Sequence, residues 1–182
     1  TDSRVAIMHA VRHVFGHVAY PLWSQRELFT DVALDRLRDG ERSVRLAASQ
    51  TLRAQVRRMA SSISADGTDA TSKATDKAIR GLLRSVKQRL AQASAAETET
   101  YLVALGSLGF LQGDLLVAIL MTLVEHLVHA DSAVRAVAHK QMRRVAHERQ
   151  CNAVVDLFWD EIDDVYLFLV ASVLHVPLLV SE

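Results

Sequence analysis

Histidines at helical spacing are the residues of this 182-residue sequence that most invite a metal ion. His9, His13 and His17 recur every four residues, so one face of a helix would carry all three imidazoles. A zinc site also needs further ligands and a defined set of partners behind them. No Cys or acidic residue is spaced to complete such a site. We therefore predict a polar stripe, with a histidine metal site as the enzymatic alternative, and we expect no cofactor.

A second histidine pattern, Glu125-His126-x-x-His129, reverses the order of the zinc-protease motif, in which a His precedes the Glu. The carboxylate would then face the wrong way to act as a base. We expect these side chains and Thr122 to form a solvent-facing stripe of one helix. Cys151 is the single cysteine, which excludes an internal disulfide.

Three glycines, Gly106, Gly109 and Gly113, raise the question of a phosphate-binding loop. Their spacing is G-x-x-G-x-x-x-G, whereas a dinucleotide loop needs G-x-G-x-x-G after a strand and a P-loop ends in G-K-[ST]. No lysine lies in this segment, and a helix is expected in front of it. We predict a structural turn, in which the glycines let two helices turn sharply and approach closely.

Five cations form the best candidate for a binding surface. They are spaced by 4, 3, 4 and 3 residues opposite an apolar helix face, and we call them the basic stripe: Lys73, Lys77, Arg80, Arg84 and Lys87. Nucleic-acid backbone, an acidic protein and the chain's own acidic half are all candidate partners, beside a plain solvated helix face. No aromatic residue alternates with the cations, so at most sequence-independent electrostatic binding is expected.

The chain carries no net charge, but its charges are unevenly distributed. Residues 1–93 hold 16 Lys and Arg against 9 Asp and Glu, and residues 94–182 hold 5 against 12, so the halves carry +7 and −7. This asymmetry can be satisfied inside one chain, between copies in a homodimer, or by separate partners. An acidic patch around Trp159 is either solvated surface or a docking site for a basic partner: Asp156, Asp160, Glu161, Asp163 and Asp164.

Composition and periodicity predict an all-α fold. Half of the residues are hydrophobic and only 5% are aromatic, and the apolar residues recur with a helical period without sustained strand alternation. Helices are expected near residues 4–18, 24–39, 41–60, 73–92, 95–108, 114–129 and 131–149, with one kinked or two short helices over 152–174. The apolar run 115–128 is too short to span a bilayer, so no membrane contact is expected.

A repeat in the sequence indicates how the helices pair. An acidic residue, Val, Arg and Ala recur at the same spacing 90 residues apart, as Glu41, Val44, Arg45 and Ala48 and as Asp131, Val134, Arg135 and Ala138. Two units of about 45 residues match the period of paired-helix HEAT repeats. In such a unit the acid caps the second helix, Val and Ala pack on the first, and Arg can reach a neighbouring repeat. We predict stacked antiparallel helix pairs, a HEAT-like α-solenoid segment, with another helical bundle as the alternative.

Three segments in this order, GSLGFLQGDLL, HADSAVRAVAHKQMRRVA and VVDLFWDEIDDVYLFLVASVL, resemble the UME domain of ATR-type checkpoint kinases. These kinases are Ser/Thr protein kinases related to phosphatidylinositol 3-kinases. The upstream segment RDGERSVRLAASQTL resembles the HEAT repeat that precedes that domain. The matching positions are Gly106, Leu108, Gly109, Gly113, Asp114 and Leu115, with Phe158 and Phe168 in the final helix pair.

The resemblance implies a middle part of the regulatory α-solenoid of a nuclear DNA-damage checkpoint kinase. Its partners would be other segments of the same kinase and an ATR-interacting subunit, and direct contact with nucleic acid is left open. On this basis we expect HEAT-like helices at 1–60, a flexible loop at 61–72, a basic amphipathic helix at 73–93 and a UME-like helical domain at 94–182. The first residue is not Met, and we expect a piece of a longer protein.

We therefore expect a structural and interaction segment that is not itself an enzyme, although the parent chain would be a Ser/Thr protein kinase. The sequence has none of the nucleotide-binding and catalytic-loop signatures that phosphoryl transfer requires. Two alternatives to this function remain: a segment of an unrelated helical-repeat adaptor, and an anion- or nucleic-acid-binding helical module.

Overall fold

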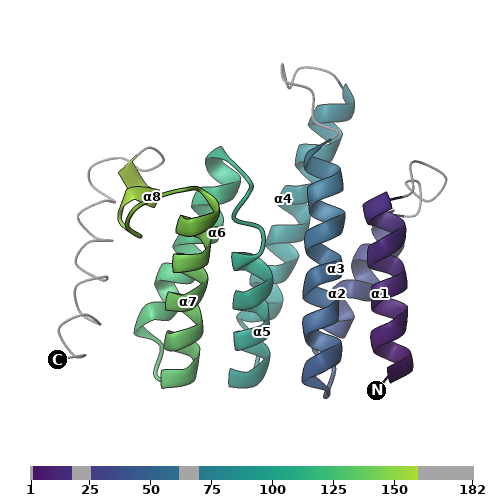
Figure 1. Cartoon of the computed structure of the whole chain (residues 1–182), viewed down its shortest axis with the longest axis horizontal. Helices are drawn as coiled ribbons and strands as arrows, with labels where there is room; N and C mark the ends of the chain where they lie inside the picture. The colour runs from purple at the N-terminus through teal and green to yellow at the C-terminus, as the bar shows by residue number, and fades with distance from the viewer. Residues whose placement is uncertain (1, 18–25, 62–69, 160–182) are drawn as a thin grey trace. The chain divides into compact units, whose positions relative to one another are not determined.

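The computed structural model describes residues 2–17, 26–61 and 70–159. These residues form eight α-helices and one 3-10 helix and contain no strand, which confirms the all-α prediction (Figure 1). The chain divides into two compact units, unit 1 (Thr1–Ala104) and unit 2 (Leu105–Glu182).

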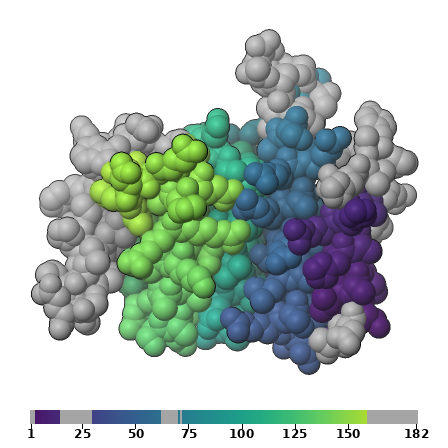
Figure 2. Space-filling view, viewed as in Figure 1, coloured from purple at the N-terminus to yellow at the C-terminus, as the bar shows by residue number. Residues whose placement is uncertain are grey.

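Unit 1 is built around α3 (Arg42–Ala60), which packs against α1 (Asp2–His17), α2 (Arg26–Arg36) and α4 (Ala70–Leu90). Apolar residues repeat every four positions along α3, which gives the helix one continuous core face. These residues are at most 1% exposed: Val44, Ala48, Leu52 and Val56. In Figure 1, α1 and α3 lie side by side, and their side chains meet in the space-filling view (Figure 2).

Polar contacts fix the register of α1 on α3. The buried Thr51 hydroxyl donates to the backbone oxygen of Met8 at 2.9 Å, and Arg12 donates to the Gln50 side chain at 2.7 Å. Since sliding α1 by one turn would break both bonds, they hold the two helices in one alignment.

The helix α4 has the strong two-sided character that the sequence predicts. Its inner residues are 0–6% exposed: Ile79, Leu82, Leu83, Val86 and Leu90. The helix begins at Ala70, so residues 70–72, which were expected in the flexible loop, belong to α4. Ser72 is 1% exposed and continues the inner face toward the N-terminus of the helix. Ser61, also expected in the loop, is the C-cap residue of α3, and residues 62–69 lie outside the described residues.

Unit 1 continues into α5 (Ala95–Gly106), and the boundary between the units falls within this helix. A capping box begins α5. Glu97 Oε2 accepts a hydrogen bond from the Ser94 amide at 2.8 Å, and Ser94 Oγ accepts one from the Glu97 amide at 3.5 Å. This reciprocal pairing satisfies backbone amides that have no partner inside the helix.

Unit 2 contains α6 (Gly113–Glu125), the 3-10 helix η2 (His126–Val128), α7 (Ser132–Glu148) and the short α8 (Asp156–Trp159). Its core is formed between α6 and α7 by residues that are at most 1% exposed: Leu116, Ile119, Leu120, Leu123, Val134, Ala138, Met142 and Val145. Among the described helices of the whole chain, none is both long and apolar enough to cross a membrane.

The predicted solvent-facing stripe of the sixth helix is wrong at Thr122, which is 1% exposed. Its hydroxyl donates to the backbone oxygen of Ala118 at 2.8 Å, so a buried hydroxyl is satisfied within its own helix. The predicted helix 114–129 also ends earlier, because η2 replaces the α-helix after Glu125. Since α6 is apolar on nearly every side, periodicity alone could not say which side faces water.

Candidate functional site

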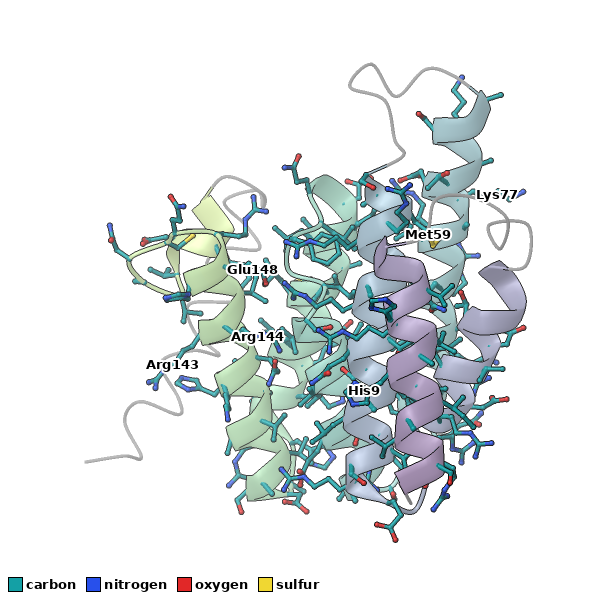
Figure 3. The ribbon with its side chains drawn as sticks, turned by 45° about the vertical axis from the view of Figure 1, so that its right-hand side comes forward. His9, Met59, Lys77, Arg143, Arg144 and Glu148 are labelled. Atoms are coloured by element: carbon teal, nitrogen blue, oxygen red, sulfur yellow. The ribbon has the colours of Figure 1, made fainter. Side chains whose placement is uncertain are left out.

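The basic stripe lies on the surface of unit 1. All five of its side chains, Lys73, Lys77, Arg80, Arg84 and Lys87, are exposed. Arg80 forms an ion pair with Asp76, one turn earlier, at 2.6 Å. Lys77 points outward from α4 (Figure 3). The buried inner face of α4 fixes the rotation of the helix, so these cations are held in a row on a rigid element.

The two arginines of the sequence repeat make the same contacts. Arg45 Nη1 donates to the backbone oxygens of Asp39 and Gly40 at 2.9 and 3.0 Å. Arg135 Nη1 donates to those of His129 and Ala130 at 2.7 and 2.8 Å. In each case the acceptors lie six and five residues earlier, in the turn ahead of the helix. Each arginine therefore fastens the start of its helix to the chain that precedes it.

Arg45 also makes a contact beyond its own turn. Its Nε donates to the Thr100 hydroxyl of α5 at 3.0 Å, in addition to the two turn carbonyls. The described bonds of Arg135 stay within its own turn. The packing residues of the repeat behave alike in both copies, because Val44, Ala48, Val134 and Ala138 are all 0% exposed.

A further repeated contact was missed from the sequence. Asp39 Oδ1 accepts from the Glu41 amide, and His129 Nδ1 accepts from the Asp131 amide, both at 3.0 Å. These acceptors are also 90 residues apart. The signal was present, since both positions precede the helix by the same number of residues and both residue types accept hydrogen bonds.

The predicted capping role of the acidic residue holds in one copy and not in the other. Asp131 Oδ1 accepts from the Ala133 amide at 2.8 Å and caps α7. Glu41 occupies the same place before α3, but its side chain makes no capping bond. A glutamate is one methylene longer than the side chains that favour this position, and Asp39 already binds the backbone there.

Asp39 is the most deeply buried carboxylate of this turn, with a side chain that is 2% exposed. Arg4 Nη1 lies 2.8 Å from both of its oxygens, and Arg36 lies 3.4 Å from one. The pKa of Asp39 is lowered, first by the hydrogen bond from the Glu41 amide and then by the charges of Arg4 and Arg36, against the opposing effect of burial. This cluster ties α1 to the turn between α2 and α3.

The glycine segment is a packing feature of unit 2. A Cβ on Gly106 would lie 2.5 Å from Gln141 Cβ, and a Cβ on Gly109 would lie 2.6 Å from Val145 Cγ2. Both partners are on α7, so these two glycines permit a close approach to α7, which is neither of the two helices that the turn connects. Gly113 has φ +55, a left-handed conformation that favours glycine at the start of α6.

The histidines do not gather into a metal site within the part of the chain that is described. His9 lies on the exposed side of α1, as does His13, and the side chain of His17 is outside the described residues (Figure 3). His126 and His129 stack with ring centroids 6.0 Å apart. Over residues 2–17, 26–61 and 70–159, no three His, Cys, Asp or Glu side chains are placed to hold a metal ion.

Most of the acidic patch falls outside the described residues, which applies to Asp160, Glu161, Asp163 and Asp164. Asp156, its described member, accepts from the Ala153 amide at 2.8 Å at the start of α8. Its observed contact is therefore that of a carboxylate at a helix N-terminus.

A shallow groove of about 170 Å³ lies between α2 and α4, with Met59 of α3 among its lining residues. Leu34, Leu82 and Ala78 give it apolar walls, and Asp31 is its one titratable lining residue. Thr30 and Ser85 complete the lining with two hydroxyl side chains.

Comparison of the chain with models of protein families, with curated proteins and with solved structures gave no match. The resemblance to the UME domain therefore rests on the residues quoted for it.

Proposed function

We propose that this chain is a non-catalytic scaffold segment built of HEAT-like helix pairs stacked as an α-solenoid, and that it serves architecture and protein–protein contacts. The observation that supports this most is the shared turn of the two hairpins, in which Arg45 and Arg135 donate to carbonyls at the same two positions. A bond pattern that recurs at a fixed interval is what tandem repeats produce, because each repeat is one supersecondary unit.

We further propose that the parent protein is an ATR-type checkpoint Ser/Thr kinase, with the chain in its UME-containing regulatory region. This part of the proposal is supported by the resemblance of the glycine segment and of the helices that follow it. The kinase would be nuclear. Its partners would be other segments of the same kinase and an ATR-interacting subunit.

The reading frame that encodes the chain tests the kinase assignment. A downstream kinase domain with a nucleotide-binding loop and a catalytic loop is expected in the same frame. An unrelated downstream domain would leave the helical-repeat adaptor as the better proposal.

Association of the parent protein with the ATR-interacting subunit tests the scaffold role. Arg45→Ala combined with Arg135→Ala removes the bonds that hold both turns, and we expect several-fold lower recovery of the subunit. Arg42→Ala combined with Lys140→Ala is the matched control, because it removes the same charge from two exposed positions. Equal recovery with both double variants would show that the repeated turns are not needed for this contact.

A further inference from the structure

We propose that the basic stripe of α4 binds the phosphate backbone of double-stranded nucleic acid, independently of base sequence. This inference concerns unit 1 alone and does not depend on the scaffold function proposed above.

The placement of the cations is the first argument. Lys73, Lys77, Arg84 and Lys87 are exposed on one side of α4, while Ile79 and Val86 on the opposite side are 0% exposed. The helix cannot rotate to bury the stripe without exposing its core face. Arg80 lies in the same row but already binds Asp76. We therefore expect the other four cations of the stripe to contact an anion.

The length of the row fits a polyanion better than a single small anion. Lys73 and Lys87 are 14 residues apart, which is about 21 Å along a helix at 1.5 Å per residue. A duplex carries one negative charge per about 1.7 Å of its axis and therefore presents roughly twelve charges over this distance. A free phosphate could meet only neighbouring members of the row.

The surroundings of the stripe favour a nucleic acid over an acidic protein. The large hydrophobic residues that are exposed among the described residues are Ile7, Leu46 and Val128, and none of them lies on α4. Ala74 and Gln88, which flank the stripe, offer little apolar area. Protein interfaces place apolar and aromatic side chains at their centre and are depleted of charge there. A surface that offers mainly cations and little apolar area suits a partner held by its backbone charge.

The helix α4 contains no aromatic residue, which favours double-stranded over single-stranded nucleic acid as its ligand. Proteins that prefer single strands stack bases on aromatic side chains, which this helix cannot do. Lysines and arginines that contact phosphates fix position without reading sequence. We therefore expect a duplex to bind at least as tightly as a single strand.

Fluorescence anisotropy of the 182-residue chain with a labelled duplex of about 20 base pairs tests the inference. Four phosphate contacts predict that log K falls with log salt concentration at a slope of about −3.6. Replacing Lys77, Arg84 and Lys87 together by Ala should reduce the magnitude of that slope by about 2.7 and weaken binding about tenfold or more at 50 mM salt. Two duplexes of opposite base composition should bind within about twofold of each other.

The matched control is Lys140→Ala, Arg143→Ala and Arg144→Ala, which removes the same charge from three exposed positions of α7. Arg143 points outward from that helix (Figure 3). If the α7 variant binds the duplex within about twofold of wild type, the assignment to α4 is supported. An equal loss of affinity in the α4 and α7 variants overturns it. Three other results also overturn it: no binding of duplex at 50 mM salt, tighter binding of the single strand, or displacement of duplex by polyglutamate at an equal concentration of charge. Circular dichroism verifies that each variant keeps its helix content.

Discussion

At the scale of single residues, the packing of unit 2 depends on glycines that leave room for a neighbouring helix. Gly109 faces Val145 across the contact between the glycine segment and α7. We expect Gly109→Ala to destabilise the protein by about 1–3 kcal/mol, because a Cβ only 2.6 Å from Val145 Cγ2 forces side chains or backbone to shift. Urea unfolding monitored by circular dichroism measures this loss.

Gly81→Ala is the matched control for that substitution. Gly81 lies inside α4, and a Cβ there would meet nothing within 4 Å apart from the backbone of its own helix, so we expect a gain of about 0.5–1 kcal/mol from helix propensity. Val145→Ala added to Gly109→Ala should recover part of the loss, because it removes the atoms that clash. A Gly109→Ala variant as stable as wild type would show that α7 is not packed closely on this segment.

The carboxylate of Asp39 predicts a pH dependence of stability. Its folded pKa lies below the ordinary value of 3.8, first because it accepts the hydrogen bond from the Glu41 amide. A group with a lowered folded pKa stabilises the fold above its unfolded pKa, and this stabilisation is lost as pH falls through the folded pKa. We expect wild type to lose stability below about pH 4 and Asp39→Asn to lose less over that range.

Unfolding free energies measured from pH 6 down to the acid limit of folding test this prediction. Asp35→Asn is a suitable control, because Asp35 is exposed and is also paired with an arginine, Arg89, at 2.8 Å. Surface ion pairs contribute little, so its acid profile should stay close to that of wild type. Parallel profiles for wild type and Asp39→Asn would contradict the role assigned to the carboxylate.

At the scale of elements, the two copies of the repeat provide an internal comparison of helix capping. Asp131→Ala removes a capping bond and should cost about 1 kcal/mol, mainly through the first turn of α7. Glu41→Ala changes the equivalent residue of α3, whose side chain makes no capping bond, and should stay within about 0.5 kcal/mol of wild type. Chemical denaturation of both variants measures the difference, and equal losses would mean that the copies are capped alike.

The sequence predicted the helices that have a strong two-sided pattern. The seventh helix was expected over 131–149 and is observed as Ser132–Glu148, because Asp131 marks its start and apolar residues recur along one face. Ser94 and Glu97 show the S-x-x-E pattern of a capping box at the start of α5, where the structure has one. The buried position of Thr122 could not be predicted, because α6 is apolar on almost every side and tertiary packing decides which side faces the core.

In the candidate site, the sequence could predict only which side chains of a helix are exposed, because helical periodicity decides that exposure. The basic stripe follows from 3–4 spacing, and its members are exposed. The bonds of Arg45 and Arg135 to the carbonyls of their turns could not be predicted in the same way, because a long side chain that donates to backbone carbonyls leaves no complementary residue type in the sequence. The placement of Arg4 on Asp39, 35 residues away in the chain, likewise depends on how α1 packs.

At the scale of the whole molecule, the two compact units have opposite charge. Unit 1 holds 16 Lys and Arg against 11 Asp and Glu, and unit 2 holds 5 against 10, so their net charges are +5 and −5. Opposite charges on separate surfaces attract across molecules as well as within one. From these net charges we expect unit 1 of one copy to attract unit 2 of another in a heterologous contact, which lengthens into chains unless it closes.

We expect this attraction to appear as self-association that salt reverses. Sedimentation equilibrium in about 20 mM salt should give a mean mass above the 20.1 kDa of one chain, returning to 20.1 kDa near 500 mM, because the Debye length falls from about 20 Å to about 4 Å over that range. Replacing Lys77, Arg84 and Lys87 by Ala lowers the charge of unit 1 from +5 to +2 and should weaken association. The triple α7 variant at Lys140, Arg143 and Arg144 makes unit 2 more negative and should strengthen it. A mean mass that does not change with salt concentration, or that shifts in the same direction in both variants, would show that the opposite charges of the units do not drive assembly.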